Sequence, residues 1–289
     1  MVKKIASIAS AGGIEIYAGK KDAYSFYASP YQAHRDYAAV DIRQNNKFGE
    51  DAYSPVSGTV VKTLKFESPT ITGEGLPEYL IIIKSGRNIA RIMHAEPTIK
   101  AGEKIAAGDV IGKLIKNGFF SSWVDPTLHV EVRKPKDYIR ARGGLELTPE
   151  IENGKTRSTN TISGVVKETS PRNVTVETNK KITANVGEET ALIDGATNID
   201  YAGVFGKFDK GKEVKLGTTK LGGIISSGTH SSLFSTEPLY ISVNNISFGG
   251  IHFTASKKEV KLLPKKYGET GLRKGQRIKI RIENVGRRI

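Results

Sequence analysis

The sequence predicts an all-β protein, because short runs rich in β-branched residues recur along the whole chain and helix-period patterns are scarce. Glycine, proline, asparagine and aspartate separate these runs, which include GTVVKTL, EYLIIIKS, LHVEVRK, NVTVET, PLYISV and RIKIRIE. We expect helix at most as a short segment near residues 134–141. With 38% hydrophobic and 26% charged residues, the composition is that of a folded protein.

The chain divides into three expected blocks. At 289 residues it is long enough for more than one domain. Residues 147–161 are polar and lack periodicity, and residues 226–238 are rich in serine, so we interpret both segments as breaks. The blocks are a β domain at 1–150, a small β-barrel at 161–228, and a basic strand segment at 237–289 that packs on the second block.

The first 17 residues have some features of a signal peptide, since Lys3 and Lys4 precede an apolar run. That run is short, is diluted by serine, and stops at Gly12 and Gly13. The segment GIEIYA therefore predicts a first β-strand instead. On this basis we expect a cytoplasmic protein, with an extracytoplasmic or virion-associated location as the alternative.

Two absences restrict the chemistry. No run approaches the roughly 18 apolar residues of a membrane-spanning helix. The chain has no cysteine, so disulfides, cysteine-ligated zinc, iron–sulfur clusters and thiol nucleophiles are all excluded. Metal chemistry would have to use histidine, aspartate or glutamate.

Two glycine-containing turns in the first block favour a barrel-sandwich fold. The segments YSPVSGTVVKTL and IKAGEKIAAGDVIGKL each place glycine before a strand, at Gly58 and at Gly102 and Gly108. Paired turns of this kind occur in barrel-sandwich folds, which include lipoyl and biotinyl carriers. A carrier needs an exposed lysine at a hairpin tip, and no Met-Lys or Asp-Lys hairpin lies between these segments.

Six segments in this block occur in a specific order, over roughly residues 28–136: RDYAAVD, YSPVSGTVV, YLIIIK, IMHAEP, AGEKIAAGDVIG and PTLHVEVRK. This order resembles the lysostaphin or LytM type of zinc endopeptidase, which has the duplicated hybrid motif fold and mostly cuts peptidoglycan cross-links. The resemblance implies that fold for the first block. It also implies a zinc site assembled from an HxxxD motif and a later HxH motif, with further histidines assisting the reaction.

Carried over by position, the resemblance makes Asp41 and His129 zinc ligands and His94 an assisting histidine. Two positions depart from the pattern: Tyr37 stands where the first histidine ligand belongs, and Thr127 stands where the other assisting histidine belongs. Without the resemblance, the histidines could simply be packed, hydrogen-bonded residues of strands.

These departures favour a protein without catalytic activity. A catalytic zinc normally has three protein ligands, whereas Asp41 and His129 supply only two. A tyrosine hydroxyl with a pKa near 10 is a poor third ligand, because it must be deprotonated to bind. We therefore expect a non-catalytic homologue that acts as a binding or structural module, without a cofactor; zinc would bind weakly if it binds.

An active zinc metallopeptidase with a rearranged ligand set is the alternative, with His34 or Asp36 as the substitute ligand. Seven residues separate His34 from Asp41, so in a continuous strand the two would face opposite sides, unless the loop SPYQAHRD breaks the alternation. Strand parity puts residues 37 and 41 on one face, and likewise residues 127, 129 and 131. We expect Glu131 to pair with a basic neighbour.

The remaining two blocks contain fewer candidate functional residues. Residues 162–219 have the strand and turn pattern of a five-stranded, OB-like barrel, but they are nearly neutral and poor in aromatic platforms for nucleic acid. The last 39 residues hold 12 basic and three acidic residues, so a polyanion, a nucleic acid or a protein partner could bind there. The same cations could equally form the solvated face of strands such as QRIKIRIEN. The candidate surface comprises Lys257, Lys258, Lys265, Lys266, Arg273, Lys274, Arg277, Lys279 and Arg281.

Overall fold

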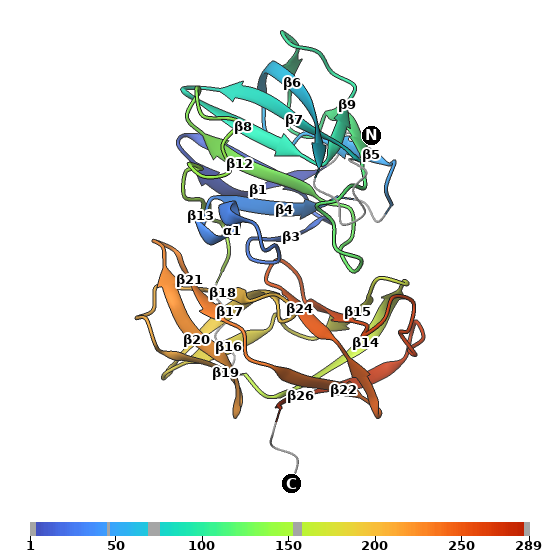
Figure 1. The fold of residues 1–289 in the computed structure, drawn as a ribbon. Coiled ribbons are helices and arrows are strands. Elements are labelled where there is room, and N and C mark those ends of the chain that lie inside the picture. The colour runs from blue at the N-terminus through green and yellow to red at the C-terminus, as the bar shows by residue number, and fades with distance from the viewer. Residues whose placement is uncertain (1–3, 45–46, 69–75, 153–157, 286–289) are drawn as a thin grey trace. The chain divides into compact units, whose positions relative to one another are not determined.

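A computed structural model describes residues 4–44, 47–68, 76–152 and 158–285, and it confirms the all-β prediction (Figure 1). The one helix among these residues is α1 (Gln32–Arg35), whereas residues 134–141 form turns and bends and not the expected short helix. The chain divides into two compact units. Unit 1 comprises residues 1–24 and 31–150, and unit 2 comprises residues 25–30 and 151–289.

Three antiparallel sheets make up unit 1. Their strand orders are β13-β1-β2, β10-β6-β7-β8-β12-β4-β3 and β5-β11-β9. The strands are β1 (Ile5–Ala11), β2 (Ile14–Gly19), β3 (Ala23–Ser25), β4 (Ala39–Arg43), β5 (Asp51–Tyr53), β6 (Gly58–Ser68), β7 (Leu76–Ser85), β8 (Asn88–Met93), β9 (Ala95–Pro97), β10 (Lys104–Ile105), β11 (Val110–Leu114), β12 (Leu128–Arg133) and β13 (Thr148–Pro149).

The stretch with signal-peptide features forms a hairpin of β1 and β2. Gly12 and Gly13 make its turn with φ values of 54° and 80°, a region that costs glycine little. Part of the expected linker at 147–161 is also a strand, since Thr148 and Pro149 pair with β1; residues 153–157 of that linker lie outside the described residues. No helix in the described part of the chain is long and apolar enough to cross a membrane.

The glycines of the two predicted turns are structurally required. A Cβ atom added at Gly58 would clash with the carbonyl oxygen of Lys84, because β6 and β7 approach closely there. Gly102 and Gly108 have φ values of 94° and 95°, which other residues adopt only with strain. The turns at Gly102 and Gly108 lead into β10, which pairs with β6, and into β11, which pairs with β5 and β9.

Unit 2 contains a closed barrel that shares one strand with an open sheet. The barrel order is β16-β19-β20-β21-β18-β17, and pairing between β16 and β17 closes it; β17 then continues into β24-β25-β15-β14-β26-β22-β23. The strands are β14 (Thr161–Thr169), β15 (Val174–Thr178), β16 (Thr183–Val186), β17 (Glu189–Ala196), β18 (Tyr201–Phe205), β19 (Glu213–Leu216), β20 (Thr219–Ser227), β21 (Ser231–Ser235), β22 (Leu239–Val243), β23 (Ile246–Phe248), β24 (Gly250–Thr254), β25 (Glu259–Leu263) and β26 (Arg277–Asn284).

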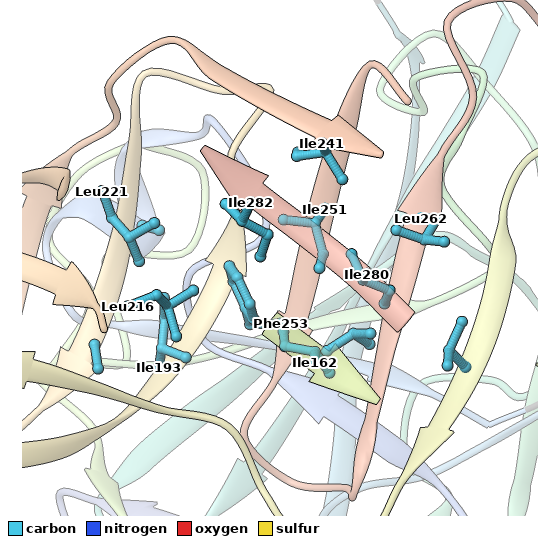
Figure 2. Close-up of a cluster of buried hydrophobic side chains, with 14 of the residues drawn as sticks. Ile162, Ile193, Leu216, Leu221, Ile241, Ile251, Phe253, Leu262, Ile280 and Ile282 are labelled. Carbon is cyan, nitrogen blue, oxygen red and sulfur yellow. The ribbon is translucent and has the colours of Figure 1, made fainter. Parts of the chain in front are cut away.

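This topology differs from the expected separation into blocks at 161–228 and 237–289. The barrel has six strands, not five, and it excludes β14 and β15, which pair instead with β26 and β25 from the end of the chain. One buried apolar cluster runs through both parts, so no separate core exists for either block among the described residues. Figure 2 shows part of this cluster, to which Ile193 and Leu216 of the barrel and Phe253, Ile280 and Ile282 of the open sheet all belong.

A buried carboxylate ties residues 25–30 into unit 2. Asp194 on β17 is fully buried, and its Oδ2 atom accepts hydrogen bonds from the Ser25 hydroxyl at 2.8 Å and from the main-chain N–H groups of Phe26 at 2.6 Å and Tyr27 at 3.0 Å. Its Oδ1 atom accepts from the N–H of Ala255 at 3.1 Å. One side chain thus satisfies four donors that would otherwise be buried without partners.

Replacement of Asp194 by asparagine tests this anchor. The new side-chain amide would present N–H groups to main-chain N–H donors, so we expect the Asp194→Asn protein to lose about 1 to 3 kcal/mol of unfolding free energy, as measured by urea denaturation. Asp209→Asn is the control, because Asp209 is 90% exposed and its substitution should change stability by less than about 0.5 kcal/mol. Equal stability of Asp194→Asn and the wild type would contradict the anchoring role.

Candidate metal centre

Strand register places the site residues in one row across the central sheet of unit 1. Asp41 of β4 pairs with His129 of β12, which pairs in turn with Met93 of β8. Met93 pairs with Leu80 of β7, and Leu80 with Leu64 of β6. Directly paired residues point to the same face of a sheet, so these five side chains lie side by side on one face.

The alternate residues form the core on the opposite face. Val40, Ile42, Leu128, Val130 and Val132 are all fully buried there. This arrangement confirms the predicted alternation along β12, because His129 and Glu131 face the site while the apolar residues between them face the core. Packing of the apolar face therefore fixes which polar residues of β4 and β12 meet.

The chain before β4 does not continue as a strand. The helix α1 ends in a Schellman-type cap, in which the N–H of Ala38 bonds to the carbonyl of Ala33 at 2.8 Å and the N–H of Tyr37 bonds to the carbonyl of His34 at 3.2 Å. Tyr37 occupies the left-handed position of this cap, with φ 59°. The expectation that residues 37 and 41 share a strand face is wrong, because the strand begins only at Ala39.

This helical turn brings His34 to the site. The His34 side chain is fully buried, and its Nε2 atom lies 3.3 Å from Asp41 Oδ1 and 3.2 Å from His129 Nδ1. His129 Nδ1 and Asp41 Oδ1 are 2.9 Å apart. Strand parity predicts that His34 and Asp41 face opposite sides of the sheet. His34 instead lies beside Asp41, because the chain between them makes a helical turn and is not a continuous strand.

His34, Asp41 and His129 form a group whose donor atoms suit one metal ion. Zinc binds imidazole nitrogen and carboxylate oxygen at about 2.0 to 2.2 Å, so neighbouring ligand atoms of a tetrahedral site are separated by about 3.3 Å. The three separations of 2.9 to 3.3 Å come close to that value. Two imidazoles and one carboxylate are also a ligand set that zinc and other first-row divalent metals accept.

Glu131 fixes the orientation of the His129 ring. Its Oε1 atom lies 2.9 Å from His129 Nε2, and the carboxylate is held by Arg91 and, at 2.5 Å, by Arg133. The expected pairing of Glu131 with a basic neighbour is confirmed, with two arginines involved. A proton on Nε2 that is donated to Glu131 leaves the Nδ1 lone pair directed at Asp41 and His34, as a metal ligand requires.

The two hydrogen-bonding carboxylates also change the protonation of the metal-free site. Burial opposes the charged forms of both Asp41 and His129, but their mutual interaction outweighs it. The two imidazoles hold the pKa of Asp41 well below its usual range. Hydrogen bonds to Asp41 and Glu131 raise the pKa of His129 to about 9, so without metal this imidazole carries a proton at neutral pH.

A second buried polar group lies next to this site. His94 follows β8 with φ 73°, and its Nδ1 atom is 2.5 Å from Oε2 of Glu78, which also accepts a hydrogen bond from Asn117 at 2.7 Å. Burial would raise the pKa of Glu78, but the hydrogen bond from His94 lowers it below the usual value. The ring centroids of His94 and His129 are 6.0 Å apart. Among the described residues no partner of His94 Nε2 is found.

Sequence reasoning missed Glu78 and Asn117. A signal for Glu78 was present, because the residue stands two positions before Leu80 and alternation puts it on the face of the site row. Asn117 lies in the loop before β12, and no local pattern relates it to Glu78. Asp36 and Thr127 belong to no donor group among the described residues: Asp36 accepts a hydrogen bond from Gln32 at 2.6 Å, and Thr127 is half-buried just before β12.

A pocket of about 490 Å³ opens beside the histidines. Its wall includes Tyr31 and Phe119, whose rings pack edge to face at 5.3 Å, and both His94 and His129 line it. Phe119 precedes Phe120, which contacts the His94 ring at 4.8 Å between centroids. The aromatic loop before β12 therefore walls the site.

The basic residues of the last block lie mostly at the surface. Arg277, Lys279 and Arg281 occupy the exposed positions of β26, while Ile278, Ile280 and Ile282 point into the core of unit 2. Lys257 is half-buried, and Lys258, Lys265, Lys266, Arg273 and Lys274 are exposed. The alternation along β26 is that of a strand with one solvated face.

The zinc affinity of variants tests whether His34 is a metal ligand. We expect one zinc per chain after dialysis and metal analysis, and an affinity at least about 100-fold lower in His34→Ala, since loss of a direct ligand should exceed the 10 to 100-fold cost of an outer-shell change. Asp36→Asn is the matched control, and its affinity should equal that of the wild type because Asp36 bonds to Gln32. The reverse pattern would make Asp36 the third ligand.

The pH dependence of zinc binding should report His129. Because the folded-state pKa of about 9 lies above the ordinary 6.5, the proton stabilises the metal-free fold below pH 6.5, and this stabilisation disappears as the pH rises through 9. Zinc must displace that proton, so its apparent affinity should rise about tenfold per pH unit between 7 and 9. Calorimetry in two buffers of different ionisation enthalpy measures the released proton. Glu131→Gln should release less of it at pH 7, and zinc binding without proton release would contradict this assignment.

Comparison with known proteins finds one similarity. Residues 15–149 match a family model described as the N-terminal domain of a domain of unknown function, DUF8155. The match covers slightly less than half of the chain and includes His34, Asp41, Glu78, His94 and His129. No curated protein and no solved structure gave a match.

Proposed function

We propose that unit 1 is a zinc-dependent hydrolase that cleaves amide bonds in peptides. The observation that carries this proposal is the assembly of His34, Asp41 and His129 within 3.3 Å of one another, beside a further imidazole that is held by a buried carboxylate. The sequence alone favoured a non-catalytic module because it supplied two ligands. With His34 in the group, the alternative of a rearranged ligand set has the stronger support.

Zinc held by these three residues would polarise a substrate carbonyl and lower the pKa of a water molecule, which are the two contributions that hydrolysis needs from a metal. A metal held by these residues would lie beside the pocket that His129 and His94 line. Glu131 and its two arginines keep the His129 ring in the orientation in which Nδ1 is a ligand.

His94 is positioned to move protons. Its Nδ1–H donates to Glu78, which fixes the ring and its tautomer and leaves Nε2 able to accept a proton and to return it. Glu78 is itself fixed by the N–H groups of Tyr79 and His94 and by the Asn117 amide. The resemblance implies two assisting histidines, but Thr127 replaces one of them, so His94 carries this role alone.

The pair of His94 and Glu78 favours hydrolysis over oxidation. Two histidines and one carboxylate bind iron(II) in oxygenases as well. An oriented general acid–base next to the ligands serves amide hydrolysis, in which the leaving amine must be protonated. The aromatic loop that holds Phe119 and Phe120 then encloses the reacting groups.

Activity of the zinc-loaded protein tests the proposal. We expect hydrolysis of at least one peptide in a panel of cross-linked, glycine-rich and apolar sequences, followed by mass spectrometry of the products. In His94→Gln we expect a kcat about 10² to 10⁴-fold lower with the zinc content unchanged. His129→Ala should lose both zinc and activity. A full complement of zinc with no cleavage of any peptide would support the non-catalytic module, and iron with oxygen-dependent products would indicate an oxygenase.

A further inference from the structure

The pocket beside the metal ligands has an apolar floor that continues their row. Leu64, Leu80 and Met93 stand in register with His129 across β6, β7, β8 and β12, and Phe66 and Phe119 add aromatic surface. A volume of about 490 Å³ is within the range of specific ligand pockets. A bound peptide that reaches the metal would therefore meet an apolar cavity directly beside it.

One polar atom in this wall has no partner among the described residues. Arg91 lines the pocket, is 5% exposed, and its Nε atom is buried without a hydrogen bond. The other guanidinium nitrogens are satisfied: Nη1 donates to the carbonyls of Tyr138 and Arg140 at 3.2 and 2.8 Å, and Nη2 donates to Glu131. The Nε atom is buried beneath the pocket surface, so a ligand in the pocket does not reach it, and the guanidinium is otherwise paired within the protein.

The local charges favour a neutral occupant of the pocket. Glu131 pairs with both Arg91 and Arg133, and Arg133 also lies 3.4 Å from Asp137. Asp137 also pairs with Arg140 at 2.8 Å, but Arg140 is 76% exposed and its charge is solvated. The two buried cations are thus matched by two carboxylates, so a charged ligand group would add an unmatched charge to an apolar pocket, whereas an apolar side chain would not.

We propose that this pocket is the subsite for a bulky apolar side chain of the substrate, aromatic or branched aliphatic. This inference rests on the proposed function, and it names the substrate class: peptides with a large apolar residue next to the cleaved bond. Glycine-rich cross-links would leave the apolar floor exposed to water.

Binding of short peptides tests the inference without requiring cleavage. The probes are Ac-Gly-Gly-Xaa-Gly-Gly-NH2 with Xaa as Phe, Leu, Gly or Glu, and the readout is the dissociation constant from NMR titration of the full chain with and without zinc. We expect the Phe and Leu peptides to bind at least about tenfold more tightly than the Gly and Glu peptides.

Three variants separate the pocket from other effects. Leu64→Trp fills the pocket and should abolish the preference for Phe, whereas Val110→Trp, at an exposed position of β11, should leave it unchanged. Ile139→Asp is a second test that the fold should tolerate, because Ile139 lines the pocket and is 69% exposed.

The outcomes for the two proposals are distinguishable. Equal binding of the Phe and Gly peptides, or a preference for Phe that survives in both Leu64→Trp and Ile139→Asp, would overturn the subsite even if the zinc protein cleaves glycine-rich peptides. Selective binding of the Phe peptide that these variants abolish would support the subsite, even if no peptide is hydrolysed and the proposed hydrolase is wrong.

Discussion

The buried carboxylate of Glu131 is the interaction on which the site of unit 1 depends. It accepts from His129, Arg91 and Arg133, and all four side chains are at least nine-tenths buried. Removing one member of such a network leaves a buried charge without its partner, which is strongly unfavourable. The network therefore fixes the His129 ring on one side and, through Arg91, the carbonyls of residues 138–140 on the other.

Much of the fold and part of the site follow from local sequence pattern. The strands of the central sheet are recognisable as short runs rich in β-branched residues, and alternation along β12 predicts that His129 and Glu131 face away from the core. His34 could not be placed in this way. A four-residue helical turn, closed by Tyr37 in a left-handed conformation that usually selects glycine, changes the direction of the chain between His34 and Asp41.

In unit 2 the sequence does not reveal which distant strands pair with each other. Periodicity identifies β14, β15, β25 and β26 one by one, but it does not say which strand lies beside which. The partners β14 and β26 are separated by more than a hundred residues, and their register depends on a core that both halves of the chain contribute to. The same holds in unit 1, where folding brings Glu78 to His94 and Asn117 to Glu78 from separate segments of the chain.

The path of the chain has a consequence for any attempt to divide this protein. The chain passes from one unit to the other three times, at residues 24–25, 30–31 and 150–151. A fragment that ends at Glu150 would carry every proposed metal ligand, yet residues 25–30 would lose Asp194, whose carboxylate holds them. His34 follows Pro30 by only four residues. The segment that leads into the first proposed ligand is therefore held in its conformation by residues more than 150 positions later in the sequence.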